Sequence, residues 1–348
     1  MIKFYGDQIC CIADIHIGVH QNSAFWHKVT NDWAVWLCDE LRKKKIKDIV
    51  ISGDLFHFRD EIAVNTLHEA SKILENFNDF NLIILCGNHD CFLKDSSEIN
   101  SLQPFKKWQN ITVIDTITTI QHNDKTIAFV PWGSKLVDIP KVDIIFGHFE
   151  ISSFKMNTHT VCVDGLKSSD LIEKGNIIFT GHFHNRDERF YDGKGIVYVG
   201  NPFQMDFSDA TLVKGYYIID VLTSTYKFTA NKISPKHFNI LLSELTKQGT
   251  ITNNDKKHIY NNLIKLRIDR RISPEHAEIL ITKIKQYLPA QLIIDYDFTV
   301  NEYDLSSDKK DFSGIDIEQA ITEFINLMDI NNKSEIINYT INLYRNAK

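Results

Sequence analysis

The chain has 348 residues, of which 43% are hydrophobic and 24% are charged, as in an ordinary globular protein of two or three domains. Its formal net charge of -6 argues against a protein that coats nucleic acid non-specifically, but does not exclude an enzyme that grips a few phosphates through metals. No apolar run is long enough to span a bilayer, and the N-terminus lacks a signal-peptide pattern. The six cysteines show no zinc-ligand spacing and lie mostly in apolar runs, so we expect reduced core residues in a cytoplasmic protein.

Short apolar runs alternate with amphipathic helices over residues 1–231. A run at 8–13 precedes an expected helix at 24–41, and a run at 48–52 precedes an expected helix at 62–77. Such alternation predicts a layered α/β domain. Further strands are expected at 82–85, 112–120, 126–131, 142–146, 176–180, 196–199 and 215–221.

The composition changes after about residue 232, and a small α/β domain is expected over 232–300. Residues 301–312 are rich in Asp, Glu, Ser and Lys and predict a flexible tether. Residues 313–348 contain two amphipathic helices, which cannot bury themselves well alone, so a partner surface is expected; docking back on the same chain is the alternative. The elements expected in the small domain are a helix through 234–245, a strand at 258–269, a helix through 273–288 and a strand at 291–300.

Five of the expected strands end in side chains of the kinds that bind metals. In layered α/β folds ligands bind outside the carboxyl ends of strands, so one edge of one sheet is expected to collect all five loops. The most informative stretch follows the buried strand at 82–85, where a glycine lets the chain turn and an amide, an imidazole and a carboxylate follow. The ordered set is Asp14-Ile15-His16, Gly53-Asp54, Gly87-Asn88-His89-Asp90, Gly147-His148 and Gly181-His182-Phe183-His184.

The candidate ligands offer oxygen and imidazole donors and no thiolate. Such donors favour a borderline-hard divalent ion such as Mn²⁺ or Fe²⁺, with Mg²⁺ and Zn²⁺ less favoured. Seven ligands are too many for one tetrahedral site and suit two ions about 3.5–4 Å apart that share a carboxylate, an arrangement that promotes phosphoester cleavage. The seven are Asp14, His16, Asp54, Asn88, His148, His182 and His184.

This ordered set resembles the calcineurin-like metallophosphoesterase superfamily, which implies a layered β-sandwich core flanked by helices. The resemblance also implies that His89 is a catalytic histidine that stabilises charge on the phosphoryl group or protonates the leaving oxygen, and that Asp90 orients its ring. It implies the following ligand sets: Asp14, His16 and His184 for one metal, Asn88, His148 and His182 for the other, and Asp54 as the bridge.

Within that superfamily, the run from Gly53 to Asp60 resembles the double-strand-break-repair nucleases of the SbcD branch, which place a second histidine at the position of His57 that contributes to exonuclease action. The run from Gly147 to Glu150 is similar to the versions that large bacteriophages encode. The resemblance implies a Mn²⁺-dependent phosphodiesterase that cuts DNA 3′ to 5′ from ends and cleaves single-stranded or hairpin DNA. It further implies a homodimer through the helix at 62–77, and docking of residues 313–348 on an SbcC-like coiled-coil ABC ATPase.

Two other functions compete with this interpretation. A phosphodiesterase for cyclic or small nucleotides on the same core would act alone and would not need the helices of 313–348. A scaffold that had lost its chemistry would lack ligands, whereas all seven are present. Separately, the exit of a predicted strand carries Arg267, Arg270 and Arg271, which either touch DNA phosphates or form a solvated loop.

Overall fold

The computed structural model describes residues 2–156, 160–247, 253–269, 272, 274–296, 318, 321–322, 325–326 and 332–346. Contacts divide the chain into two compact units, Met1–Asp297 and Phe298–Lys348. None of the helices in the described ranges is long and apolar enough to cross a membrane. All six cysteines are buried with free thiols, as the sequence predicted.

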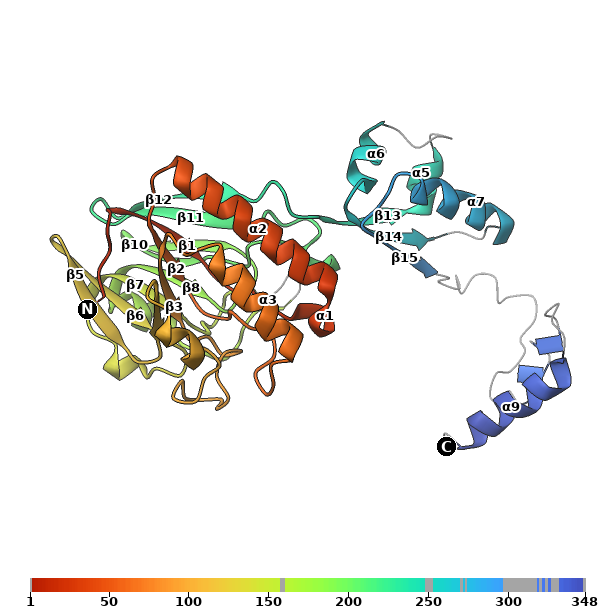
Figure 1. Cartoon of the computed structure of the whole chain (residues 1–348), viewed down its shortest axis with the longest axis horizontal. Coiled ribbons are helices and arrows are strands. Elements are labelled where there is room, and N and C mark those ends of the chain that lie inside the picture. The colour runs from red at the N-terminus through yellow and green to blue at the C-terminus, as the bar shows by residue number, and fades with distance from the viewer. Residues whose placement is uncertain are drawn as a thin grey trace. The chain divides into compact units, whose positions relative to one another are not determined.

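Two six-stranded sheets packed face to face form the core of the first unit, so the predicted layered α/β sandwich is confirmed (Figure 1). Strands β1 to β4 of the first sheet run parallel, and the later strands β11 and β12 add an antiparallel edge. The first sheet has the order β12 (Thr225–Ala230), β11 (Gly215–Asp220), β1 (Gln8–Ile12), β2 (Asp48–Ile51), β3 (Asn81–Leu85) and β4 (Ile111–Ile114). The second has the order β5 (Thr118–His122), β6 (Lys125–Val130), β7 (Val142–His148), β8 (Gly175–Gly181), β10 (Lys194–Tyr198) and β9 (Asp187–Tyr191).

Side chains of the first sheet alternate between two apolar layers. In β1, Ile9 and Cys11 pack between the two sheets, whereas Cys10 and Ile12 pack in the layer beneath the helices. Both faces of the strand are therefore covered, which explains why its sequence is apolar throughout rather than alternating.

Helices α2 (Ala24–Lys43) and α3 (Val64–Glu75) pack against each other on the outer face of the first sheet (Figure 1). Trp33 of α2 is fully buried there, as expected for a packing face. Within α3, which was predicted as an amphipathic helix, Leu67 is 41% exposed and Val64 is 87% exposed. These two side chains lie three positions apart, so they share one outward face of the helix.

The strand expected at 112–120 is two strands that lie in different sheets. β4 ends at Ile114 in the first sheet, and β5 begins at Thr118 in the second. The apolar residues keep their spacing from β4 into β5, so the sequence pattern does not reveal that the chain passes from one sheet to the other. The edge strands β9 and β12 were not predicted because their side chains are only partly buried and their apolar signal is weak. The remaining short elements are α1 (Val19–Asn22), η1 (Gln103–Lys107), η2 (Leu136–Asp138), α4 (Ser168–Ile172) and η3 (Phe207–Asp209).

A third sheet of three parallel strands follows in the first unit. The helix expected through 234–245 is wrong over its first half, because that half pairs as a strand with its neighbour in the sheet. The helix start predicted at Pro274 is observed. The backbone N–H of His237 donates to Gln204 Oε1 at 2.6 Å and joins the small sheet to the preceding loop. The elements are β13 (His237–Leu241), α5 (Leu242–Lys247), α6 (Asn253–Ile259), β14 (Leu263–Ile268), α7 (Pro274–Lys285) and β15 (Gln291–Tyr296).

The second unit contains the helix α9 (Lys333–Asn346), which agrees with the last helix expected from the sequence. Its exposed apolar side chains Ile336, Tyr339 and Leu343 follow helical spacing and share one face. Other predicted features lie outside the described residues, namely the tether at 301–312 and most of the first of the two amphipathic helices expected in 313–348.

Candidate metal centre

The seven predicted ligands come together at the carboxyl ends of strands from both large sheets. The expectation that one edge of one sheet collects them is therefore wrong. The two sheets face each other, so loops from both open on the same site. Asp14 and His16 follow β1, Asp54 follows β2, Asn88 follows β3, His148 ends β7, and His182 and His184 follow β8.

Asp14, His16 and His184 form the first cluster, with ligand atoms within 4.8 Å of one another. The Nε2 atoms of His16 and His184 lie 2.9 Å apart. Two nitrogens bound at right angles to one ion, each at about 2.1 Å, would be separated by about 3 Å. Asp14 Oδ1 accepts the backbone N–H of His182, whereas Oδ2 is buried without a hydrogen-bond partner in the described part of the chain. These donors fit a cation, which would satisfy the orphaned oxygen.

Asp54, His148 and His182 form the second cluster. His148 Nδ1 donates to the carbonyl of Ser52 at 2.8 Å, which leaves a lone pair on Nε2 when the ring is neutral. That Nε2 faces Asn88 Oδ1 at 2.9 Å, and the same oxygen lies 2.8 Å from His182 Nδ1. Two acceptors at this distance repel unless a proton or a cation lies between them. The second cluster is thus also suited to a metal ion.

Asp54 lies between the two clusters. Its Oδ2 is 3.6 Å from His16 Nε2 in the first cluster and 3.5 Å from His148 Nε2 in the second. Its Oδ1 accepts the backbone N–H of His89 at 2.8 Å, which fixes the carboxylate plane. A single carboxylate that reaches donors of both clusters is suited to bridge two ions.

Burial and mutual charge set the protonation of these groups. Burial raises the pKa of Asp14 to about 8, and the charge of Asp54 adds to the increase. Burial alone would raise the pKa of Asp54 as well, but the imidazoles of His148 and His16 hold that pKa well below its usual range. Burial alone would lower the pKa of His148, but Asp54 raises it to about 9. Burial and His148 lower the pKa of His182 to about 3. A divalent ion would displace the protons held by Asp14 and His148.

Four of the seven predicted ligands have left-handed backbone conformations, with φ of 54° at Asp14, 51° at His16, 55° at Asp54 and 96° at His182. Such conformations are strained for residues other than glycine and tend to be concentrated at functional sites. Close packing surrounds them, because a Cβ added at Gly87 would lie 2.2 Å from Asp54 Oδ1. The glycines of the sequence motifs therefore allow the ligand-bearing turns to approach one another.

His89 and His57 lie beside the first cluster. The ring centroid of His89 is 4.8 Å from that of His16, and the His57 ring stacks on His89 at 5.7 Å with 19° between the planes. His89 Nδ1 contacts the backbone carbonyl of His57 at 2.5 Å, so Nδ1–H is the donor. Because Nδ1 is engaged in this bond, Nε2 is the ring nitrogen of His89 that remains available to contact an oxygen of a substrate.

Asp90 does not orient the His89 ring, and that prediction is wrong because the ring Nδ1 bonds elsewhere. The buried carboxylate of Asp90 accepts the backbone N–H groups of Leu55, Phe56 and Gly87 at 3.0–3.2 Å. It therefore ties the turn after β2 to the turn after β3, and each turn carries a predicted ligand.

Sequence reasoning missed Lys214, which supports the loop after β8. Its Nζ donates to the carbonyl of His184 at 2.9 Å and pairs with Asp209 at 2.7 Å, with both side chains buried. No local motif marks this lysine, and its contact depends on the path of the chain between two distant segments.

The arginines considered from the sequence are only partly described. Arg267 lies on β14, and its Nε is 3.8 Å from Asp295 Oδ2. Arg270 and Arg271 lie outside the described residues. Contact of this group with DNA phosphates therefore stays a prediction.

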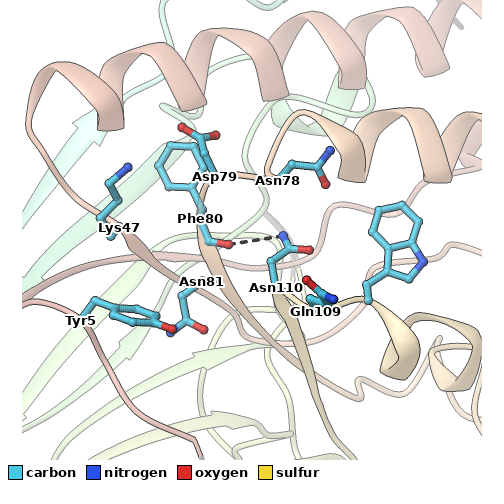
Figure 2. A pocket seen from close by; sticks show the side chains of 9 residues that line it. Tyr5, Lys47, Asn78, Asp79, Phe80, Asn81, Gln109 and Asn110 are labelled. Atoms are coloured by element: carbon cyan, nitrogen blue, oxygen red, sulfur yellow. Dashed lines mark hydrogen bonds between the residues drawn. The ribbon is translucent and has the colours of Figure 1, made fainter.

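A cavity of about 710 Å³ lies at the opposite ends of the strands that carry the first three ligand loops (Figure 2). It is lined by residues at the amino ends of β2, β3 and β4, including Lys47, Asn81 and Asn110. None of the seven predicted ligands lines it. This cavity is thus separate from the metal-type donors.

The structure thus defines a layered α/β protein in which two facing sheets carry paired clusters of metal-type donors. No family model matches the chain. The chain is a homologue of exonuclease subunit 1 of Enterobacteria phage T4, with 23% identity over 98% of this chain and 99% of that protein. The resemblance seen in the sequence to nuclease subunits of large bacteriophages is thereby confirmed. An uncharacterized protein of Acanthamoeba polyphaga mimivirus is 21% identical over 57% of this chain and 16% of its own length.

Solved structures that are similar to this chain match it at 12% sequence identity. They include an archaeal phosphodiesterase (TM-score 0.36, 64% of this chain and 99% of that one) and Vps29 from Entamoeba histolytica (TM-score 0.33, 65% and 99%). The Plasmodium protein GAP50, described as an anchor in the inner membrane complex, has a TM-score of 0.38 and covers 65% of this chain and 85% of its own. Likeness at this level says nothing about the chemistry of the site.

Proposed function

We propose that this protein is the nuclease subunit of an SbcCD-like recombination and repair complex. It would act in the cytoplasm as a two-metal phosphodiesterase that digests DNA 3′ to 5′ from ends and cleaves single-stranded or hairpin DNA. The observation that carries the proposal is the convergence of seven oxygen and imidazole donors in two clusters that Asp54 joins. The full-length likeness to a phage exonuclease subunit supports DNA as the substrate.

Two divalent ions would occupy the clusters, and the mixed oxygen and imidazole donors favour Mn²⁺, with Mg²⁺ or Fe²⁺ as alternatives. When bound, such ions supply charge neutralisation at the non-bridging phosphoryl oxygens and an activated water. Asp14, His16 and His184 would hold one ion, Asn88, His148 and His182 the other, and Asp54 would touch both.

The chain's own residues would orient the substrate and supply a proton. His89 is fixed by the bond from its Nδ1–H to the His57 carbonyl, so a protonated ring can donate from Nε2 to the leaving oxygen. The stacked His57 ring limits rotation of His89 and narrows the approach to the first cluster. Asp90 would keep the two ligand-bearing turns at a fixed separation.

Two exposed apolar faces would serve assembly. Ile336, Tyr339 and Leu343 on α9 would dock on the coiled-coil base of an SbcC-like ABC ATPase. Val64 and Leu67 on α3 would contribute to a homodimer. Deletion of residues 313–348 should abolish complex formation with the ATPase while leaving the nuclease folded; unchanged complex formation would contradict this assignment.

Mn²⁺-dependent digestion of end-labelled duplex and single-stranded DNA, with and without the ATPase partner, tests the proposal. Wild-type protein should release nucleotides from 3′ ends and should cleave single strands. His89→Asn should retain its metal ions but lose cleavage. If His89→Asn cleaved DNA as fast as wild type, the role given to His89 would be wrong.

A further inference from the structure

Arg59 lies on the turn after β2, downstream of the bridging carboxylate, and its guanidinium is partly buried. Its Nη2 donates to the backbone carbonyl of Asn88 at 2.6 Å. The side-chain oxygen of Asn88 faces the imidazoles of His148 and His182. One residue therefore connects the guanidinium to the second donor cluster.

Arg59 differs from the other arginines in its charge environment. Five of the six arginines that the structure describes have a carboxylate oxygen within 4 Å. For Arg59, the described residues provide a single hydrogen bond to a neutral carbonyl and no carboxylate. A guanidinium has five N–H donors, so most N–H groups of Arg59 have no hydrogen-bond partner among the described residues. The five paired arginines are Arg42, Arg186, Arg189, Arg267 and Arg345.

A partly buried cation without a counter-charge loses hydration and favours an anion in its place. A guanidinium fork binds phosphate or carboxylate through paired N–H donors, and phosphate is the anion that a nucleic-acid substrate supplies. Arg59 touches the main chain of Asn88 and not its metal-facing amide oxygen. Arg59 is therefore attached to the residue that carries this amide oxygen without taking a place among the metal-type donors themselves.

We propose that Arg59 binds the phosphate that neighbours the scissile phosphate in a DNA strand. This inference rests on the proposed nuclease function and adds a specificity residue to it. A cyclic nucleotide or a simple phosphodiester has one phosphate and cannot make this contact. Arg59 therefore makes the site prefer a polynucleotide strand over small phosphodiesters that the metal clusters alone would accept.

The first test compares a labelled single-stranded oligonucleotide with bis(p-nitrophenyl) phosphate, which has one phosphodiester, in the full-length protein with Mn²⁺. Arg59→Gln should lower kcat/KM on the oligonucleotide about tenfold or more, because one charge-assisted contact is lost. Its kcat/KM on bis(p-nitrophenyl) phosphate should stay within about twofold. Arg59→Lys should retain part of the oligonucleotide activity because it keeps the charge without the fork.

The second test measures oligonucleotide binding by fluorescence polarisation in a His89→Asn background, which should bind without cleaving. Arg59→Gln should reduce the slope of log K against log salt by about 0.7, the contribution of one phosphate on a single strand. The matched control is Arg42→Gln, because Arg42 is paired with Asp79 at the far end of the strands. This control should leave both the slope and the kcat/KM ratio unchanged.

Three results would overturn the proposal for Arg59. These are an unchanged salt slope, an equal loss of activity on both substrates, or a loss of bound metal in Arg59→Gln. Either of the last two would mean that the arginine merely supports the carbonyl of Asn88. By contrast, wild-type protein that hydrolysed bis(p-nitrophenyl) phosphate but no DNA would refute the nuclease function itself, whatever Arg59 does.

Discussion

The two ends of the central parallel strands differ in how well their polar groups are satisfied. At the carboxyl ends, Asp14 Oδ2, His16 Nδ1 and His57 Nδ1 are buried without hydrogen-bond partners in the described part of the chain. At the amino ends, Asn81 lies in the wall of the large cavity (Figure 2). Its amide donates to the Lys3 carbonyl and to Asp48.

The large cavity and the buried polar atoms without partners therefore lie at opposite ends of the strands. The amino-end cavity has a volume of about 710 Å³, yet its Asn110 amide already donates to the carbonyls of Phe77 and Phe80, and Asp79 is paired with Arg42. At the carboxyl ends, buried polar atoms without hydrogen-bond partners occur together with left-handed, strained turns. Unsatisfied buried groups and left-handed backbone are more informative about function than the size of a pocket.

The largest expected effect is at the carboxyl end. His89→Asn should lower kcat for DNA cleavage about 10²- to 10⁴-fold, because a positioned proton donor is lost. Its metal content, measured by mass spectrometry, should match wild type because His89 is not expected to be a ligand. A large loss of bound metal would mean that His89 belongs to the metal set.

Metal affinity should depend steeply on pH. With pKa values of about 8 for Asp14 and about 9 for His148, both groups hold protons at pH 7 and must release them when an ion binds. Affinity should therefore rise with pH, with a slope of about two in log K per pH unit between pH 6 and 7 that falls as the pH passes 8. Calorimetry in buffers of different ionisation enthalpy gives the proton release directly. A slope near zero would show that Asp14 and His148 do not hold protons in the metal-free protein, contrary to the raised pKa values.

Close packing at the ligand turns should make a single methyl group costly. Gly87→Ala would place a Cβ 2.2 Å from Asp54 Oδ1 and 2.3 Å from its backbone nitrogen. We expect a loss of about 1–3 kcal/mol in the free energy of unfolding, together with weaker metal binding. The control is Gly6→Ala near the amino end, where the nearest atom to an added Cβ is 4.0 Å away. Equal effects of the two substitutions on urea denaturation and metal affinity would show that the packing is no tighter at the ligand turns than near the amino ends.

The smallest functional effect is expected in the cavity. Asn110→Ala removes hydrogen bonds to two backbone carbonyls and should cost about 1–2 kcal/mol of stability. DNA cleavage and metal affinity should stay within about twofold of wild type. A clear loss of DNA cleavage at unchanged stability would give the cavity a functional role.

The seven candidate ligands could be predicted because each lies at the carboxyl end of a strand or within four residues of it, in a short local motif. Asp14, Asp54 and Asn88 are found by that rule alone. Asp90 was misassigned because its bonds join two turns that are distant in sequence. Lys214 could not be found, because only the folded chain brings it to the His184 carbonyl.

The secondary structure shows the same division between local and long-range information. The buried parallel strands and α2 follow from apolar spacing. β13 does not, because His237 to Leu241 carries a spacing that suits a helix, and parallel pairing with β14 decides its conformation. The crossing from β4 to β5 is likewise a consequence of sheet assembly.

The most direct test is a crystal of the full-length protein grown with Mn²⁺ and measured for anomalous scattering at the manganese edge. Two peaks are expected, one beside Asp14, His16 and His184 and the other beside Asn88, His148 and His182, with the Asp54 carboxylate between them. Peaks elsewhere, or these side chains turned away from one another with no ion among them, would contradict a two-metal centre.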